Sequence, residues 1–165
     1  MKVYGGLIGA LPGIPAAIRQ IEAAGYDGAY TAEINNDPFL PALLGAEHSE
    51  RLELATAIAV AFARNPMSVA QLAHDINQYA RGRFVLGLGS QVQAHITRRY
   101  GMPWSQPAAR MREFVLALRA IWDCWQHGTP LRFEGAFYRH TLMTPMFVPA
   151  ARDWPAPRVR IAGVG

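Results

Sequence analysis

The sequence is poor in cysteine, in lysine and in charged residues overall, and these shortages exclude several kinds of bond and binding site. Cys124 is the sole cysteine, so the chain can form no internal disulfide and has no cysteine cluster for a metal. This favours a reducing compartment, and we expect a cytoplasmic protein. Only 17% of the residues are charged and 51% are hydrophobic, so much surface should be buried inside the fold or against a partner. We expect a homo-oligomer, such as a dimer.

Long apolar runs are missing as well. The N-terminal stretch MKVYGGLIGALPG is interrupted by Gly9, Pro12 and Gly13 and is too short for a signal peptide or a membrane span, so no membrane association is expected. The formal charge of +4 rests on arginines spread along the chain, without a basic tract, and no nucleic-acid partner is expected. The five histidines show no close paired spacing, so no metal site is predicted.

Several catalytic signatures are also absent. Neither a Gly-x-Ser-x-Gly sequence nor a Ser-His-Asp order occurs, so a hydrolase has no support. A dinucleotide fingerprint after Gly87 and Gly89 would need a third small residue where Val92 stands, and no Walker-type lysine follows. These absences favour an enzyme whose chemistry is supplied by a cofactor.

What the sequence does contain is a regular alternation of short apolar runs with longer amphipathic ones, the pattern of βα units. Four strands are predicted at KVYGGLIG, DGAYTAE, LELATAIAV and RFVLGLGS. Their spacing requires crossover connections, which produce a parallel sheet. The fold class is therefore α/β, and the pattern alone leaves two architectures open, a doubly wound sheet and a closed (β/α)8 barrel.

The connecting helices have their own signals. PAAIRQIEAAG carries a face of isoleucines, Asp37 and Pro38 predict the start of a second helix, Pro66 and Ser68 precede a third, and the longest is predicted over residues 108–126. A further helix is expected after Ser90. Beyond these, GTPLRFEGAFYRHT is typical of a β-hairpin, and RVRIAGVG reads as a fifth strand with nothing to cover it.

Two stretches are candidate binding sites. After the fourth strand, Gly89, Ser90 and Gln91 form either a cradle for a phosphate at a helix N-terminus or only a tight strand-to-helix turn. After the second strand come Glu33 and then Asn36, at the sheet edge where parallel α/β folds bind ligands. Hydrogen bonding to a ligand and simple turn formation are both open for this group.

The order of these motifs resembles a known family, the bacterial luciferase-like oxidoreductases, and within it the group that uses coenzyme F420. The likeness covers nearly the whole chain and rests on EAAGYDGAYTAE, the continuous segment from DPFLPALLGAEHS to RRYGMPW, PAARMREFVLALRAIWDCW, LRFEGAFYRHTLMTP and IAGVG. The resemblance implies a (β/α)8 barrel that holds the deazaflavin at the carboxyl ends of its strands. It further implies a hydride transfer between coenzyme F420 and a small organic substrate.

The resemblance also suggests roles for particular residues. Relatives often have a non-proline cis peptide in the third strand that supports the ring, which would fall about Thr56, Ala57 or Ile58. Gly89, Ser90 and Gln91 would lie beside the phosphate or side chain of the cofactor. Asn36 and Glu33 would face the ring or the substrate. Asn36 cannot donate a proton as an acid does, so Glu33 is left as the candidate catalytic residue.

Length is where the chain departs from the family, because complete barrels of this type have about 250 residues. We therefore expect residues 1–165 to be a single partial barrel domain of about five strands with a hairpin insertion, truncated at the C-terminus. Two alternatives stay open: a luciferase-like monooxygenase that uses FMN, and a non-catalytic half-barrel that pairs with another chain through its open edges.

Overall fold

A computed structural model describes residues 1–150 and 153–163, and in it the chain divides into two compact units. The first, here called the sheet unit, comprises residues 1–59, 72–89 and the C-terminal segment from residue 156. The second, the hairpin unit, comprises residues 60–71 and 90–155. Strand β4 (Ala59–Val60) and helix α3 (Pro66–Tyr79) lie where the chain passes from one unit to the other.

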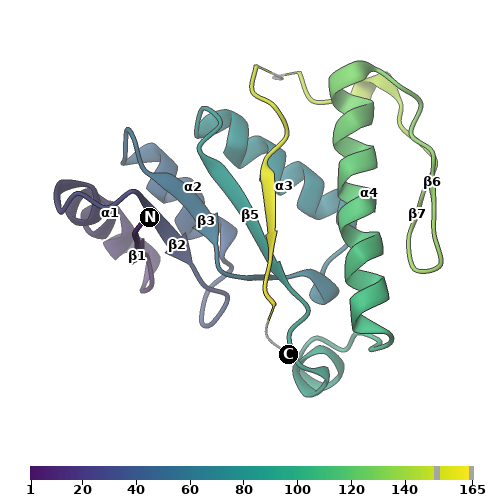
Figure 1. The fold of residues 1–165 in the computed structure, drawn as a ribbon, viewed down its shortest axis with the longest axis horizontal. Coiled ribbons are helices and arrows are strands. Elements are labelled where there is room, and N and C mark those ends of the chain that lie inside the picture. Colours follow the sequence, from purple (N-terminus) through teal and green to yellow (C-terminus); the bar gives the residue numbers. More distant parts are fainter. Residues whose placement is uncertain (151–152, 164–165) are drawn as a thin grey trace. The chain divides into compact units, whose positions relative to one another are not determined.

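The sheet unit is built on a parallel β-sheet (Figure 1). Neighbouring strands pair in parallel in the order β1, β2, β3, β5 and β8, with Tyr4 beside Gly28, Gly28 beside Glu53, and Val85 beside Arg158. Their bounds are β1 Tyr4–Gly6, β2 Gly28–Thr31, β3 Glu53–Thr56, β5 Phe84–Gly89 and β8 Arg158–Ile161. All five strands confirm sequence predictions, although Val164 and Gly165 of the fifth predicted strand lie outside the described residues.

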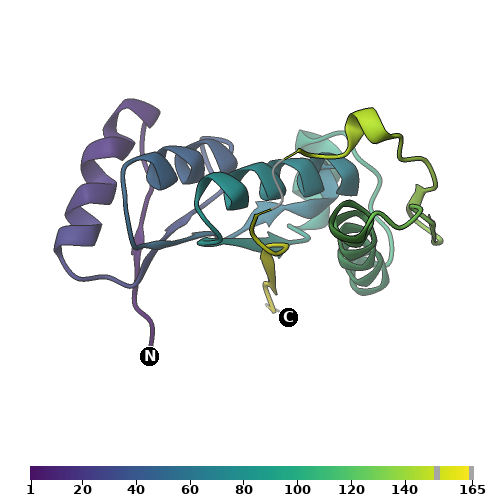
Figure 2. The same ribbon diagram turned by 90° about the horizontal axis from the view of Figure 1, so that it is seen from above.

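The helices of the sheet unit lie on one face of this sheet (Figure 2). They are α1 (Ile14–Ala23), α2 (Phe39–Glu47) and the last two turns of α3. Each lies in a crossover connection between two parallel strands. Ile14 and Ile18 of α1 are buried, and Gly5 of β1 lets the Ile21 side chain approach the strand, since a Cβ there would be 2.9 Å from it. A doubly wound sheet would carry helices on both faces, so the one-sided cover indicates part of a barrel.

Two predicted helix starts differ from the structure. Helix α2 begins at Phe39 with Pro38 as its N-cap residue, so Asp37 is one position further out than expected; its Oδ1 still accepts the Phe39 amide at 2.9 Å. After Ser90 the expected helix is present but starts only at residue 93, and most of it is the π-helix η3 (His95–Arg99). Gln91 adopts a φ of 62°, which is incompatible with a helix running directly from the strand.

The hairpin unit is organised by α4 (Pro107–His127), the longest helix, as predicted. Its buried face includes Phe114, Trp122 and Trp125, and the Trp122 indole donates to the Ala70 carbonyl at 3.1 Å. Cys124 is buried, which raises the pKa of its thiol, in line with its expected role as a small core residue. The predicted hairpin is present as β6 (Phe133–Glu134) and β7 (Arg139–His140). The remaining short helical turns are η1 Leu11–Gly13, η2 Ala61–Ala63 and η4 Pro145–Phe147.

Glu113 of α4 fixes the hairpin. Its carboxylate accepts the backbone amides of Ala136 at 3.0 Å, Phe137 at 2.7 Å and Tyr138 at 2.6 Å. Gly135 lies so close to this carboxylate that a Cβ would overlap it. Three charge-assisted hydrogen bonds on one carboxylate therefore hold the hairpin tip against the helix.

Candidate functional site

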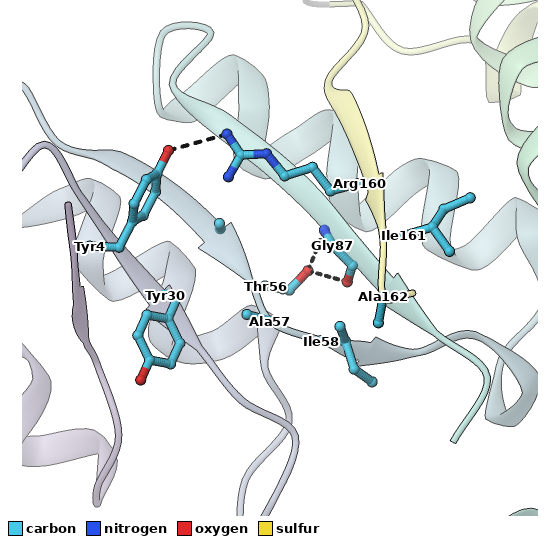
Figure 3. A pocket seen from close by; sticks show the side chains of 10 residues that line it. Tyr4, Tyr30, Thr56, Ala57, Ile58, Gly87, Arg160, Ile161 and Ala162 are labelled. Atoms are coloured by element: carbon cyan, nitrogen blue, oxygen red, sulfur yellow. Dashed lines mark hydrogen bonds between the residues drawn. The ribbon is translucent and has the colours of Figure 1, made fainter. Parts of the chain in front are cut away.

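A hollow of about 260 Å³ lies on the face of the sheet opposite the helices (Figure 3). It is formed wholly by the sheet unit, from residues of the five strands β1, β2, β3, β5 and β8 and of the segments that follow β3 and β8. The lining residues are Tyr4, Tyr30, Ala55, Thr56, Ala57, Ile58, Gly87, Arg160, Ile161 and Ala162. Most of them stand toward the carboxyl ends of the strands, where barrel enzymes place their active sites.

Small residues make this hollow possible. Ala55, Ala57, Gly87 and Ala162 leave the floor without bulky side chains, while the phenol rings of β1 and β2 form one wall. The wall itself depends on Gly28, because a Cβ there would be 2.5 Å from the Tyr4 ring. The result is a shallow, largely apolar surface of the kind against which a planar organic group packs.

At the floor of the hollow, the Thr56 side chain forms hydrogen bonds with the backbone of the neighbouring strand β5. Its hydroxyl donates to the Gly87 carbonyl at 2.7 Å and accepts the Gly87 amide at 2.9 Å. Thr56 is 2% exposed, so these bonds satisfy a buried hydroxyl. Thr56, a predicted cofactor contact, lines the hollow, and its side chain holds the floor together.

The peptide bond between Ala57 and Ile58 is cis, within the three residues that the family resemblance indicated. Both residues line the hollow. Gly89, at the end of β5, lies beneath Ile58, where a Cβ would be 2.8 Å from the isoleucine side chain. Gly89 thus serves the close packing of this strand end rather than a turn of positive φ.

A cluster of charged groups, here called the Glu53 cluster, lies at the amino-terminal end of the same sheet. The Glu53 carboxylate accepts hydrogen bonds from Lys2 Nζ at 2.9 Å, from Arg160 Nη2 at 3.0 Å, and from Tyr4 Oη and Arg158 Nη2. Burial by itself raises the pKa of this carboxylate, but hydrogen bonds from Tyr4, Lys2 and Arg158 lower it to about 2. Glu53 is therefore an anion throughout the neutral range.

Arg160 joins this cluster to the hollow. Its Nη2 also contacts Tyr4 Oη at 3.3 Å, and its guanidinium lies 5.5 Å from the centre of the Tyr4 ring (Figure 3). Hydrogen bonding to Tyr4 raises the pKa of Arg160 further, so its charge is permanent. The hollow thus has a cationic end at Arg160 and Tyr4, and an apolar end at Ala57 and Ile58.

The other predicted site residues have different surroundings. Ten described residues line the hollow, and neither Glu33 nor Asn36 is among them. Glu33 is half-buried and follows β2 by two positions, while the Asn36 amide donates to the Gly9 carbonyl at 2.8 Å and joins the loops after β1 and β2. Ser90 and Gln91 belong to the hairpin unit and bond locally, Ser90 Oγ to the Gln91 carbonyl and Gln91 Oε1 to the Val92 amide.

Sequence reasoning missed Tyr4, Tyr30 and Arg160 as site residues. Arg158 and Arg160 did carry a signal, because alternating arginines in a strand expected to be buried are costly unless they meet an anion. Glu53, at the start of another predicted strand, is that anion. The two tyrosines carried no comparable signal, since aromatic residues are common in strands of every kind.

The parts of the chain that the structure describes contain neither a metal-binding cluster nor a membrane-spanning helix. No group of three or more histidine, cysteine, aspartate or glutamate side chains gathers as a metal would require. None of the helices in residues 1–150 and 153–163 has both the length and the apolar character that crossing a bilayer demands.

Comparison with protein families matches residues 4–165 to the luciferase-like monooxygenase family. The uncharacterized protein Rv1360 of Mycobacterium tuberculosis strain H37Rv is 56% identical over 165 residues, which is 100% of this chain and 48% of that protein. A second protein of that strain, named "Putative coenzyme F420-dependent oxidoreductase Rv3520c", is 30% identical over 119 residues, 72% of this chain and 33% of its own length. The chain thus spans about half the length of its relatives, or less.

Solved structures share the fold. The EDTA monooxygenase of Chelativorans sp. BNC1 superposes with a TM-score of 0.80 at 18% identity, covering 100% of this chain and 49% of its own. An F420-dependent secondary alcohol dehydrogenase, in complex with an F420-acetone adduct, superposes with a TM-score of 0.75 at 17% identity, covering 99% of this chain and 53% of its own. The oxygenating constituent of 3,6-diketocamphane monooxygenase from Pseudomonas putida, in complex with FMN, superposes with a TM-score of 0.75 at 16% identity. It covers 92% of this chain and 46% of its own.

Proposed function

Because this chain belongs to the luciferase-like monooxygenase family, we propose that it forms the part of an F420-dependent oxidoreductase that receives the deazaflavin ring. The proposed enzyme transfers a hydride between coenzyme F420 and a small organic substrate. The family match covers residues 4–165 and supports a flavin or deazaflavin enzyme. The relative Rv3520c, which is named as a putative coenzyme F420-dependent oxidoreductase, supports the deazaflavin.

The observation that carries this proposal is the hollow in the sheet unit. A fused tricyclic ring needs a flat apolar surface bounded by small residues, and Ala55, Ala57, Gly87 and Ala162 supply one. At its cationic end, the N–H groups of the Arg160 guanidinium match the carbonyl-rich side of such a ring. The residues present therefore fit the cofactor.

Each site residue then has a role that its own position supports. The deazaflavin, when bound, supplies a ring carbon that accepts or donates a hydride. Ala57 and Ile58 form the surface under the ring, Gly89 keeps that surface closely packed, and Asn36 joins the loops that follow β1 and β2. Ser90 and Gln91 are the proposed contacts for the phosphate-bearing side chain of the cofactor.

Glu33 is the proposed proton-transfer residue. It is a half-buried carboxyl after β2, close in sequence to Asn36, which joins the loops that follow β1 and β2. Glu33→Gln should leave F420 affinity within about twofold, because Glu33 does not line the hollow. The same change should lower F420-dependent ketone reduction by about a hundredfold, the usual contribution of a general acid.

The test is a titration of the purified chain with oxidised F420 and with FMN, followed by fluorescence. We expect F420 to bind with a dissociation constant on the order of micromolar and FMN to bind at least about tenfold more weakly. Ala162→Trp, which places an indole in the hollow, should weaken F420 binding at least about tenfold. Ala16→Trp on the exposed face of α1 is the matched control and should change nothing.

Three outcomes would overturn the proposal: no saturable binding of either cofactor, binding that the Ala162→Trp variant retains, or tighter binding of FMN. The last would favour the second candidate, an FMN-dependent monooxygenase. That candidate is supported by the fold shared with the diketocamphane monooxygenase, whose structure holds FMN.

A further inference from the structure

Arg110, in the first turn of α4, is a buried cation without a carboxylate partner. It is 9% exposed, and no ion pair joins it to an acidic group in the part of the chain that the structure describes. Its guanidinium lies over two aromatic rings instead, 5.0 Å from the centre of the Phe62 ring and 5.7 Å from that of Tyr138. Burial of a charge without a counter-ion is costly, and cation–π contacts offset only part of that cost. The side chain therefore does more than fill the core.

Two nitrogens of this guanidinium bind other segments of the hairpin unit. Nε donates to Tyr138 Oη at 3.0 Å, and Nη1 donates to the Pro103 carbonyl at 2.6 Å. Pro103 belongs to the loop that connects η3 to α4. The next residue, Trp104, packs edge-on against Phe62, with 5.6 Å between the ring centres. Arg110 thus ties this loop to the helix and to the hairpin with charge-assisted hydrogen bonds.

A series of hydrogen bonds continues from this loop to the segment that follows β5. The Met102 amide, next to Pro103, donates to the Ile96 carbonyl at 2.9 Å. The Ile96 amide donates to the Val92 carbonyl at 3.2 Å, and the Val92 amide donates to Gln91 Oε1 at 3.0 Å. Ile96 is fully buried, which anchors the middle of the series in the core. Each step from the arginine to Gln91 is therefore a defined contact within the hairpin unit.

The segment at the end of this series contains the proposed phosphate contacts, Ser90 and Gln91. Gln91 has a φ of 62°, a conformation that a residue with a Cβ keeps only when its surroundings hold it there. No acidic residue occurs in the sequence between Asp75 and Glu113. The segment itself thus carries no carboxylate that would repel a phosphate.

We propose that Arg110 is a positioning residue for the phosphate-bearing side chain of the cofactor. By holding Pro103, it fixes the segment through which Ser90 and Gln91 contact the phosphate, and it does not touch the phosphate itself. This inference rests on the proposed function and adds a residue to the same site. Supporting contacts of this kind set the affinity of the groups that they orient. The hollow for the ring is built by the sheet unit, so loss of Arg110 should weaken phosphate recognition and spare ring recognition.

A pair of ligands separates these two kinds of recognition. Coenzyme F420 and the phosphate-free ribityl deazaflavin have the same ring, and only F420 carries the phosphate-bearing side chain. Fluorescence titration of the wild-type chain should show F420 binding at least about tenfold more tightly. Arg110→Met, which keeps an unbranched apolar stem, should lower the affinity for F420 about tenfold and leave that for the phosphate-free compound within about twofold. Arg110→Lys, which keeps the charge, should lose less.

The matched control is Arg112→Met. Arg112 is exposed on the same helix, so its loss removes the same charge and should leave both affinities unchanged. If Arg110 were only a structural residue of the core, its loss would lower both affinities to the same extent.

Amide hydrogen exchange in the cofactor-free chain tests the positioning itself. The amides of Met102 and Val92 should exchange at least about tenfold faster in Arg110→Met, whereas the Leu54 amide of the sheet unit should be unchanged. A direct contact between Arg110 and the phosphate would alter the affinity for F420 and leave these rates as they are. A general loss of stability would accelerate exchange at Leu54 as well.

Equal loss of affinity for the two ligands, an unchanged affinity for F420, or unchanged exchange at Met102 and Val92 would overturn this inference. Should Arg110→Met fail to fold, Tyr138→Phe takes its place, because it removes only the acceptor of Nε. It should produce the same changes at a smaller magnitude, and wild-type behaviour counts against the inference. No binding of either ligand by the wild-type chain would remove the proposed function, and the exchange rates would still decide whether Arg110 holds the segment.

Discussion

Thr56 and Gly87 exchange two hydrogen bonds, in which the threonine hydroxyl donates to the glycine carbonyl at 2.7 Å and accepts the glycine amide at 2.9 Å. A side-chain hydroxyl here takes the place of a backbone group between β3 and β5. The strands approach so closely that a Cβ at Gly87 would overlap the Thr56 carbonyl oxygen. Glycine at this position is therefore a steric requirement of the sheet.

Gly87→Ala should consequently be severely destabilising. The overlapping atom is backbone on both sides, so relief requires a shift of one strand, and we expect a loss of at least about 3 kcal/mol in the free energy of unfolding. Urea denaturation measures it. Gly13→Ala, the same substitution where nothing lies within 4 Å, is the control and should change stability by less than about 1 kcal/mol. Similar stability of both variants would contradict the close approach.

The Glu53 cluster predicts a particular dependence of stability on pH. The pKa of Glu53 is lowered to about 2 in the folded chain, so its contribution is present above the pKa of the unfolded chain and is lost as the pH falls toward 2. Glu53→Gln should cost on the order of 2 to 3 kcal/mol at pH 7, and the difference from wild type should shrink between about pH 5 and pH 2. Urea denaturation across this range tests it, and a constant difference would contradict it.

The hairpin of the second unit should depend on a single carboxylate. Glu113→Ala removes the acceptor of three backbone amides, and amide hydrogen exchange at residues 136–138 should accelerate by at least about tenfold. Glu134→Ala removes an exposed ion pair with Arg139 in the same hairpin and should have little effect. Equal acceleration in the two variants would show that Glu113 does not hold the tip.

The end of α3 offers a stabilising change. Arg81 has a φ of 53°, a conformation that costs a residue with a Cβ about 1 kcal/mol. Arg81→Gly should therefore raise the free energy of unfolding by roughly 0.5 to 1 kcal/mol, measured by thermal denaturation. Arg81→Ala removes the same charge but keeps the Cβ, so it separates conformation from electrostatics. A gain in Arg81→Ala as large as that in Arg81→Gly would assign the effect to charge.

Much of the fold was predictable because the residues that end its helices and open its turns are recognisable in the local sequence. Gly25, Gly82 and Gly128 all adopt the positive φ that ends a helix or opens a turn, and the strands begin shortly after the first two. The helix predicted after Ser90 is present, but it starts only at residue 93 and continues as the π-helix His95–Arg99. The left-handed Gln91 and its own side-chain hydrogen bond to Val92 prevent the helix from starting directly after the strand.

The site was less predictable for a different reason. Every residue of β3 and β5 is buried, so alternation does not reveal which side chains face the helices and which face the hollow. Family resemblance indicated the cis peptide, whereas its cofactor contacts at Gly89, Ser90 and Gln91 stay predictions. Tyr4, Tyr30 and Arg160 meet only because strands distant in the sequence lie in one sheet, and no local pattern carries that information.

The hydrogen bond from the Asn36 amide to the Gly9 carbonyl links the loop that follows β1 to the loop that follows β2. A ligand that pushes one of these loops outward must carry the other with it or break the bond first.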